Sequence, residues 1–319
     1  MLEKIRHFLS ELIGFYIMKA IQFYEYGDVE TMHLVNIPSP AIGPTEILIR
    51  VRASGVNPSD WKRRQGVYQA YEKLTFPAGV GVEASGVVEA VGENLSNSWI
   101  GKSVFGFGRN TAAELAVLTH WVELPANVSF ELAACTPVVF ETASRSLAYL
   151  AMQADETLFV SGASGGVGSA VVQLALAHGI NVVGSCSHKN SGYLRALGAM
   201  PVTHGDGLNI RIRRVTEKTI DAVLHVTGVG IIPELIELVG DPYKVVSVSD
   251  FGAIKYGARF CKGPPENPSL TLSALAEMLA CHKLKMPIEK KFPLADIAKA
   301  HQLSEKGHVT GKIILTIGK

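Results

Sequence analysis

Hydrophobic and polar positions follow two different patterns along this chain, and the change falls near residue 132. Before it, short apolar runs with period-two stretches, such as 46–54 and 85–92, lie between turn sequences rich in glycine and proline. Runs of this kind predict short β-strands, and few helical periods interrupt them. We therefore expect a compact, β-rich, barrel-like domain in the first part of the chain.

Beyond residue 132, predicted helices alternate with predicted strands. The strands are apolar runs without alternation, which is typical of strands buried on both faces of a parallel sheet. The predicted helices cover 133–152, 167–177, 192–198 and 233–239, and the predicted strands cover 157–162, 180–186, 201–204, 221–228 and 244–249. This order predicts an α/β fold with a doubly wound parallel sheet.

These patterns divide the chain into three parts. We assign 18–131 and 268–319 to the barrel-like domain, which we expect to be catalytic, and 132–267 to a nucleotide-binding domain. Residues 1–17 form an amphipathic N-terminal extension, because apolar residues recur there at helical spacing. Three interpretations of this extension stay open: a helix packed on the domain or a partner, a membrane-surface helix, or an upstream start ahead of Met18.

A glycine-rich stretch, SGASGGVGS at 161–169, follows the first strand of the alternating part and opens its first long helix. Glycines there allow a tight turn and let backbone N–H groups approach a pyrophosphate, and the helix N-terminus adds unpaired donors. The predicted cofactor-binding residues of this loop are Gly162, Ala163, Ser164, Gly165, Gly166, Val167 and Gly168. The simpler alternative is a tight turn without a ligand.

The end of the second strand indicates which dinucleotide would bind. NAD-binding proteins usually place an acidic residue there for the ribose 2′-hydroxyl, but 180–199 contains neither Asp nor Glu. Ser187, His188 and Lys189 occupy this strand end instead, and hydroxyls with a cation suit a 2′-phosphate. We therefore predict NADPH, with a solvated Lys189 as the alternative. The basic cluster 211–214 is interpreted as a solvated helix face in preference to a phosphate site.

Composition excludes several other classes of function. The 30 basic and 29 acidic residues nearly balance, which argues against an obligate nucleic-acid partner. The four cysteines lie far apart, so neither a disulfide framework nor a structural zinc site is indicated, and a reducing, cytoplasmic location is expected. No apolar stretch approaches the ~20 residues needed to span a bilayer.

Five segments in order give the chain a specific resemblance. They are MKAIQFYEYG at 18–27, VRASGVNPSDWKRRQG at 51–66, GVEASGVVEAVG at 81–92, VELPANVSFELAAC at 122–135 and FPLADIAKAHQLSEKGHVTGKIILTIG at 292–318. Together they resemble the zinc-independent quinone oxidoreductase, or zeta-crystallin-like, branch of the medium-chain dehydrogenase/reductase superfamily. The resemblance implies a GroES-like barrel domain and a Rossmann domain, with NADPH in the cleft between them.

The resemblance also implies roles for single residues. Asn57 would orient the nicotinamide or the substrate carbonyl, Tyr68 would line the mouth of the pocket, and Thr142 would contact the nicotinamide side. Asn57, Val82 and Val138 stand where zinc-dependent relatives place metal ligands, so metal-free chemistry is expected. HVTGVG at 225–230 and FETA at 140–143 depart from the family pattern, which puts some contacts near the nicotinamide in question.

Simpler interpretations exist for some of these residues. Asn57 and Asp60 could serve only to stabilise the Asn-Pro turn, and Tyr68 could be an ordinary packed aromatic residue. His301 is interpreted as a hydrogen-bonded helix histidine and not as a proton donor. No general acid is assigned, and solvent is expected to supply the proton.

The expected reaction is hydride transfer from NADPH to a quinone or an α,β-unsaturated carbonyl, because neither acceptor requires a Lewis acid. Two alternatives stay open: an enoyl-thioester reductase, and a nucleotide-binding adaptor or sensor without turnover. A homodimer is also expected, with the apolar strand at 244–249 on an exposed sheet edge.

Overall fold

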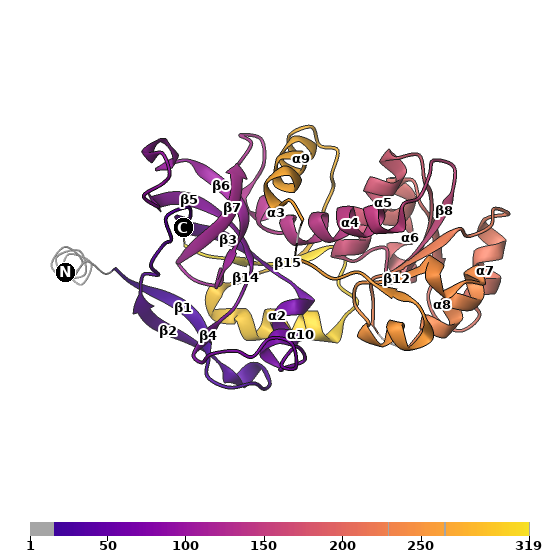
Figure 1. The fold of residues 1–319 in the computed structure, drawn as a ribbon, viewed down its shortest axis with the longest axis horizontal. Helices are drawn as coiled ribbons and strands as arrows, with labels where there is room; N and C mark the ends of the chain where they lie inside the picture. The colour runs from indigo at the N-terminus through magenta and orange to yellow at the C-terminus, as the bar shows by residue number, and fades with distance from the viewer. Residues whose placement is uncertain (1–15, 229, 265, 319) are drawn as a thin grey trace.

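The computed structural model describes residues 16–228, 230–264 and 266–318 as a two-domain molecule with the barrel domain at one end and the nucleotide domain at the other (Figure 1). The amphipathic extension predicted for 1–17 lies almost wholly outside the described residues. The first strand, β1, covers Ile17–Phe23. The fold class predicted from the hydrophobic pattern is confirmed.

The barrel domain is built around one long strand, β3 (Ile47–Val56). Its residues alternate between buried and partly buried along the first half, as the period-two pattern predicts. One edge of β3 pairs with β5 (Glu83–Val91), and the other pairs first with β7 (Leu115–Glu123) and then with β15 (Lys312–Thr316). The remaining strands are β2 (Met32–Pro38), β4 (Ala78–Gly79), β6 (Ser103–Arg109) and β14 (Ile288–Pro293).

The nucleotide domain contains a six-stranded sheet in the order β10-β9-β8-β11-β12-β13, and every pair in it is parallel. Its strands are β8 (Thr157–Ser161), β9 (Asn181–Cys186), β10 (Met200–Thr203), β11 (Ala222–His225), β12 (Val245–Ser247) and β13 (Arg259–Phe260). Counted from β8, this is the 3-2-1-4-5-6 order of dinucleotide-binding sheets. A ligand is expected at the carboxyl ends of the strands, where the order reverses between β8 and β11.

The helices of this domain are α4 (Pro137–Leu150), α5 (Gly166–Ala177), α6 (Ser191–Leu197), α7 (Leu208–Val215) and α8 (Ile232–Val239). The single helix predicted over 133–152 is wrong, because α3 (Phe130–Ala134) ends before α4 begins at Pro137. Proline lacks the N–H that would continue the first helix and restricts the residue before it, so it opens a new one.

Three helices connect the parts of the fold. Helix α2 (Pro58–Arg64) follows β3 and packs against α10 (Ile297–Lys306), whereas α9 (Pro268–Ala280) contacts both α4 and β7. The predicted domain limits stay a prediction, since α9 touches both domains. Short 3-10 turns complete the described elements at Val29–Thr31, Asn97–Trp99, His188–Asn190, Pro242–Lys244, Phe251–Tyr256 and Leu294–Asp296.

The edges of the parallel sheet differ from the prediction. Strand β12 was expected at the edge, but β13 pairs with it and is itself the edge strand. The other edge is β10, which contains Pro201. The short β13 offers too few residues for a hydrophobic pattern, which explains why it was missed.

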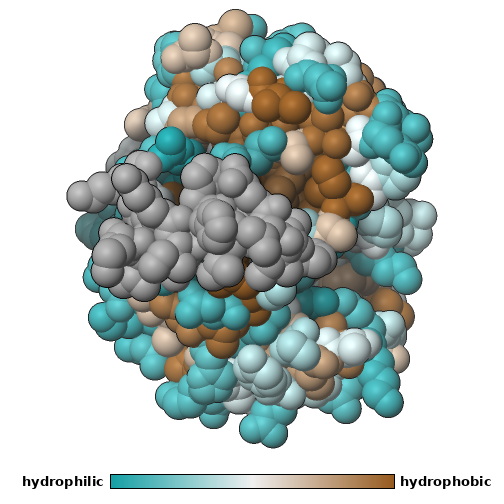
Figure 2. Space-filling model, turned by 90° about the vertical axis from the view of Figure 1, so that its left-hand side faces the viewer, coloured by the Kyte–Doolittle hydropathy of each residue, from teal (hydrophilic) through white to brown (hydrophobic). Residues whose placement is uncertain are grey.

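The outer end of the barrel domain presents a mixed surface, on which hydrophobic residues gather beside polar ones (Figure 2). Ile17 in β1 and Leu34 in β2 are among the exposed large apolar side chains of this domain. Within the described ranges, none of the helices is both long and apolar enough to cross a membrane.

Candidate active site

The glycine-rich loop between β8 and α5 is held in a shape that only glycine accepts. Gly162 has a φ of +71°, and a Cβ atom added there would lie 1.9 Å from the Thr227 Cγ2 atom. A Cβ atom on Gly168 would lie 2.3 Å from the Gly162 carbonyl oxygen. The first glycine therefore permits the turn, and the last permits the close approach of helix and loop.

Backbone donors at the start of α5 point out of this loop. Gly165 is the N-cap residue, so the N–H groups of 166–168 have no acceptor within the helix. Two other loop residues are fixed by internal bonds. The Ala163 N–H donates to the Ser185 carbonyl at 2.9 Å, and Asn190 Nδ2 donates to Ser164 Oγ at 3.0 Å. The loop thus combines a rigid backbone with unpaired donors, as a pyrophosphate site requires.

The C-terminal strand connects this loop to the barrel domain. The Gly311 N–H donates to the Ser164 carbonyl at 2.9 Å, and Gly311 forms an isolated parallel bridge with Gly165. The aliphatic part of Lys312 packs against Gly166, since a Cβ atom added there would lie 2.9 Å from Lys312 Cδ. Lys312 therefore begins at the glycine-rich loop, and its ammonium group reaches into the barrel domain.

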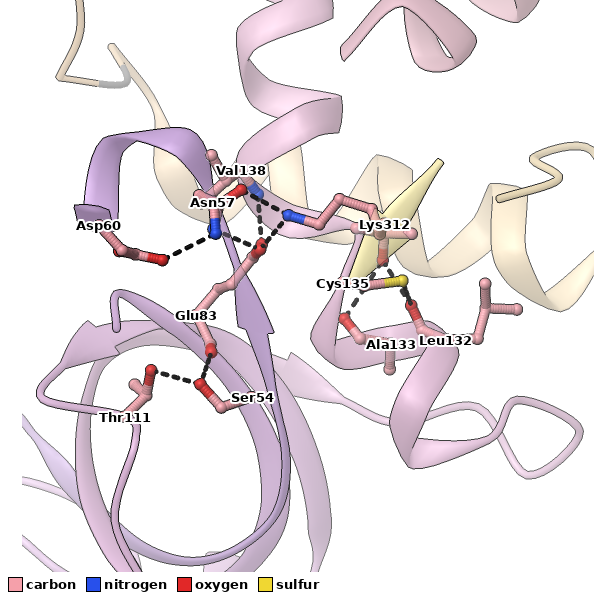
Figure 3. Close-up of polar contacts among 11 residues, drawn as sticks. Ser54, Asn57, Asp60, Glu83, Thr111, Leu132, Ala133, Cys135, Val138 and Lys312 are labelled. Carbon is pink, nitrogen blue, oxygen red and sulfur yellow. Dashed lines mark hydrogen bonds and ion pairs between the residues drawn. The ribbon is translucent and has the colours of Figure 1, made fainter. Parts of the chain in front are cut away.

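That ammonium group joins a buried polar network shown in Figure 3. Lys312 Nζ donates to Glu83 Oε1 at 2.9 Å and to Asn57 Oδ1 at 2.5 Å, and Asn57 Nδ2 donates to the same Glu83 oxygen at 2.8 Å. The second Glu83 oxygen accepts from the Val138 N–H at 2.8 Å. All three residues are at most 3% exposed.

Asn57 and Val138, two of the three residues predicted from the resemblance to stand where zinc-dependent relatives place ligands, contact Glu83 in this network. Asn57 and Val138 both donate to Glu83, and Val82 is 37% exposed beside it. In the part of the chain that the structure describes, no cluster of His, Cys, Asp or Glu is arranged to hold a metal ion. A buried ion pair of this kind needs good geometry and further hydrogen bonds, and the Asn57 amide supplies them.

A second buried carboxyl group lies at the start of α2. Asp60 Oδ2 accepts from the Asn57 N–H at 2.7 Å, which closes the first turn of the helix. Burial raises the pKa of Asp60 to about 7, although this N–H bond and the charge of Lys312 oppose the shift. Cys135 also lies nearby, and burial raises its pKa to about 12, so its thiol stays protonated and inert.

Tyr68 follows α2 and faces the nucleotide domain. Its ring meets Phe251 edge-on, with the centroids 5.9 Å apart, and Tyr71 stacks on the same ring at 6.0 Å. Burial raises the pKa of Tyr68, and the charge of Asp60 adds to this. Nearby, Lys62 Nζ donates to the Ser249 carbonyl at 3.4 Å. The segment after β12 therefore contacts Tyr68 through Phe251 and Lys62 through Ser249.

The atypical HVTGVG segment has a clear structural role. His225 is fully buried, with Nε2 3.1 Å from the Gly228 carbonyl and Nδ1 2.6 Å from Ser161 Oγ. Because a carbonyl only accepts, Nε2 carries the proton, and Nδ1 accepts from Ser161. Burial lowers the pKa of His225, which agrees with a neutral ring. The ring fixes the segment that places Thr227 against Gly162.

The other predicted site residues lie on several different elements. His188 and Lys189 are exposed after β9, and Ser187 is half-buried. Thr142 is half-buried on α4, one turn beyond Val139, whose side chain packs against Gly166. Asn57 is connected to the loop through Lys312, whereas the ring of Tyr68 contacts Phe251.

The interpretation of His301 is partly wrong. The ring is fully buried on α10, and within the described residues neither of its nitrogens has a hydrogen-bond partner. Burial lowers its pKa to about 3, and the charge of Arg64 adds to this effect. The ring is therefore neutral and cannot deliver a proton near neutral pH, in line with the expectation that it is no proton donor.

Two residues of the network were not predicted. Glu83 lies within the quoted motif at 81–92, but no role was assigned to it. Lys312 stands at the start of an apolar strand, and a charged residue among apolar ones was the available signal.

Known proteins resemble this chain in both of its domains. The family model described as alcohol dehydrogenase GroES-like domain matches 43–119, and the one described as zinc-binding dehydrogenase matches 197–315. Human quinone oxidoreductase is 30% identical, over 94% of this chain and 98% of its own length. The NADPH-dependent alkenal/one oxidoreductase of Arabidopsis thaliana is also 30% identical, over 93% of this chain and 79% of its own length.

Among solved structures, quinone oxidoreductase from Coxiella burnetii superimposes with a TM-score of 0.83 at 27% identity, covering 95% of this chain and all of that one. The family recognised from five sequence segments is thereby confirmed. The chain is an oxidoreductase that belongs to the quinone oxidoreductase family of the medium-chain dehydrogenase/reductase superfamily.

Proposed function

We propose that the chain is an NADPH-dependent, zinc-independent oxidoreductase that transfers hydride to a quinone or an α,β-unsaturated carbonyl. One observation carries the proposal. Gly311 and Lys312 join the glycine-rich loop directly to the Asn57–Glu83 network, so a dinucleotide on α5 and an acceptor beside Asn57 would meet. The human quinone oxidoreductase and the Arabidopsis alkenal/one oxidoreductase favour the same two acceptor classes.

The residues present fit a dinucleotide. The tight contacts at Gly162 and Gly168 leave no room for a Cβ atom, and the first turn of α5 offers unpaired N–H groups. The residues that would hold NADPH are therefore those of the loop, 162–168, with Thr142 on the nicotinamide side. Bound NADPH supplies the hydride; the chain's own residues position the acceptor.

Preference for NADPH rests on the strand end after β9. Lys189 is exposed there, with no acidic residue from 180 to 199 to attract a 2′-hydroxyl. A charge-assisted phosphate contact contributes roughly 1.5–3 kcal/mol, or about one to two decades in Kd. The Kd for NADPH should be lower than that for NADH by these one to two decades. The difference between the two Kd values should be smaller in the Lys189→Ala variant. Equal affinities in the wild type would refute the preference.

Asn57 can donate one hydrogen bond to the hydride-accepting substrate. Its amide has two N–H groups, of which one donates to Glu83, and among the described residues the second has no acceptor. That hydrogen can donate to the carbonyl oxygen, where negative charge develops as the hydride reaches the electron-poor carbon. A proton from solvent then neutralises the oxyanion or enolate. Tyr68 lines the entrance.

The test is purified protein with NADPH and a panel of quinones, enones, enoyl thioesters and simple alcohols. Quinones or enones should be reduced fastest, because their conjugation spreads the charge that a simple alkoxide would concentrate. Faster reduction of an enoyl thioester would favour the enoyl-reductase alternative. Oxidation of isopropanol faster than reduction of every quinone and enone would show that the reaction class is wrong.

We further propose a homodimer, now through β13. This edge strand has its outer side unpaired within the described residues, and exposed apolar residues lie around it, among them Tyr243 and Ile254. Such an edge is an association site unless it is covered. Light scattering at micromolar concentration should return twice the 34.2 kDa chain mass, and a monomer mass would refute the dimer.

A further inference from the structure

A basic groove runs along the outer edge of the nucleotide-domain sheet. It lies beside β10, between α6 and α7, the helices near the right of Figure 1, and its volume is about 420 Å³. Its polar lining comes from His188, Ser191, Arg195, Thr203, Arg211 and Arg214. Ligand sites commonly have volumes of about 300–1,000 Å³, so a nucleotide fragment would fit.

The charge of the groove has one sign. Three arginines and one histidine line it, and none of its lining residues within the described part of the chain carries a carboxylate. Arg195 and Arg214 are exposed, and neither forms an ion pair with another residue in the described ranges. Two guanidinium groups without ionic partners in one groove favour an anionic ligand. Each guanidinium can donate two parallel hydrogen bonds to two oxygens of one phosphate group.

Arg211 has a different task, and the interpretation of 211–214 as a solvated helix face is wrong for it. Its guanidinium donates to the carbonyl oxygens of Thr203 at 2.9 Å, Gly205 at 2.5 Å and Asp206 at 2.6 Å. These bonds fix the loop from β10 to α7 and keep a positive charge at the groove. The groove is therefore a formed part of the fold on this side.

The groove is continuous with the predicted cofactor site. His188 follows β9, the strand whose end was predicted to meet the adenosine ribose, and it lines the groove as well. An added peptide strand is a poor occupant of the same edge, because Pro201 in β10 has no N–H to offer it. A phosphate carried by a nucleotide remains the better match.

We propose that Arg195 and Arg214 bind the phosphate on the adenosine ribose of NADPH, so that this groove selects the phosphorylated cofactor. The inference rests on the proposed function and names residues of that site beyond Ser187, His188 and Lys189. The phosphate would enter past His188, with Arg195 on α6 and Arg214 on α7 on opposite sides. Arg213, its exposed neighbour on α7, does not line the groove.

The experiment compares Arg195→Ala, Arg214→Ala and the matched control Arg213→Ala. Dissociation constants are measured for NADPH, NADH, adenosine 2′,5′-bisphosphate and AMP by calorimetric titration of the full chain. Each groove variant should weaken NADPH and the bisphosphate at least fivefold and leave NADH and AMP within twofold. Arg213→Ala should change no constant by more than twofold, and Arg195→Lys should recover part of the loss.

Each outcome decides one of the two proposals. The groove assignment would be overturned if the groove variants lost the same affinity for phosphorylated and unphosphorylated ligands, or lost none. It would also be overturned if Arg213→Ala weakened binding as much as the groove variants do. A wild type that binds the bisphosphate no more tightly than AMP would overturn it too. If the bisphosphate behaves as expected but no quinone or enone is reduced, the groove assignment stands and the proposed reaction fails.

Discussion

On the barrel side of the candidate site, Asn57, Glu83 and Lys312 form a buried hydrogen-bonded network. On the nucleotide side, Arg195 and Arg214 are exposed and have no ionic partner among the residues that the structure describes. Apart from the second N–H of the Asn57 amide, the hydrogen bonds of this network are complete before any ligand binds. The nucleotide side has positive charges and backbone N–H groups that are available to bind a ligand. Substitutions within the buried network should therefore lower the stability of the fold, whereas substitutions of Arg195 and Arg214 should change only the affinity for the ligand.

The largest effect on stability is expected when one partner of the buried ion pair is removed. Lys312→Met leaves the Glu83 carboxylate buried without its cation, which typically costs about 3–5 kcal/mol of the free energy of unfolding. Urea denaturation measures the loss. The double variant Lys312→Met/Glu83→Gln should recover a large part of it, since no buried charge remains. A loss below about 1 kcal/mol in the single variant would mean that water reaches the pair.

The pH dependence of stability tests the buried carboxyl of Asp60. Burial raises its pKa from 3.8 to about 7 in the folded chain, so its favourable contribution is present below about pH 4 and is lost as the pH rises through about 7. The full loss is at most about 4 kcal/mol. Asp60→Asn should therefore be more stable relative to wild type at pH 8 than at pH 5. Parallel pH curves for the two proteins would contradict the raised pKa.

Asn57 contributes both to the buried network and to the proposed reaction. Asn57→Ala removes the amide that links Lys312 to Glu83 and the free hydrogen proposed to donate to the acceptor. The rate with a quinone should fall by one decade or more, equivalent to about 1.4 kcal/mol in the barrier. Circular dichroism should show an intact fold. Normal turnover in this variant would leave Asn57 as a turn residue only.

Removal of metal ions is expected to have no effect on the protein. Asn57, Val82 and Val138 provide no ligand set, so prolonged chelation should change neither turnover nor Tm. Zinc measured in freshly purified protein tests the same point. Stoichiometric zinc that is lost together with activity would show that the comparison with zinc enzymes was misaligned.

Local patterns predicted the nucleotide side well. The glycine loop, the strand before it and α5 are adjacent in sequence, so turn chemistry and helical periodicity identify them together. The break before Pro137 could also have been predicted, because a proline within a helical pattern usually marks a boundary.

The barrel side could be predicted only in part, because its partners are distant in sequence. Lys312 is 229 residues from Glu83 and 255 from Asn57, and no local pattern reports such a contact. The roles of Arg211 and Arg214 also differ although the two residues are three apart on one helix. Both guanidinium groups line the groove, and only the surrounding fold determines that Arg211 also binds the carbonyl groups of the loop before α7.

Pro201 has a consequence for how copies of this chain can assemble. The parallel sheet ends in β13 on one side and in β10 on the other, and β10 carries a residue that cannot donate a hydrogen bond to a further strand. Two copies joined at β13 by a twofold axis would expose only β10 at both ends of the combined sheet. Growth would stop there, which favours a closed pair over an open fibre.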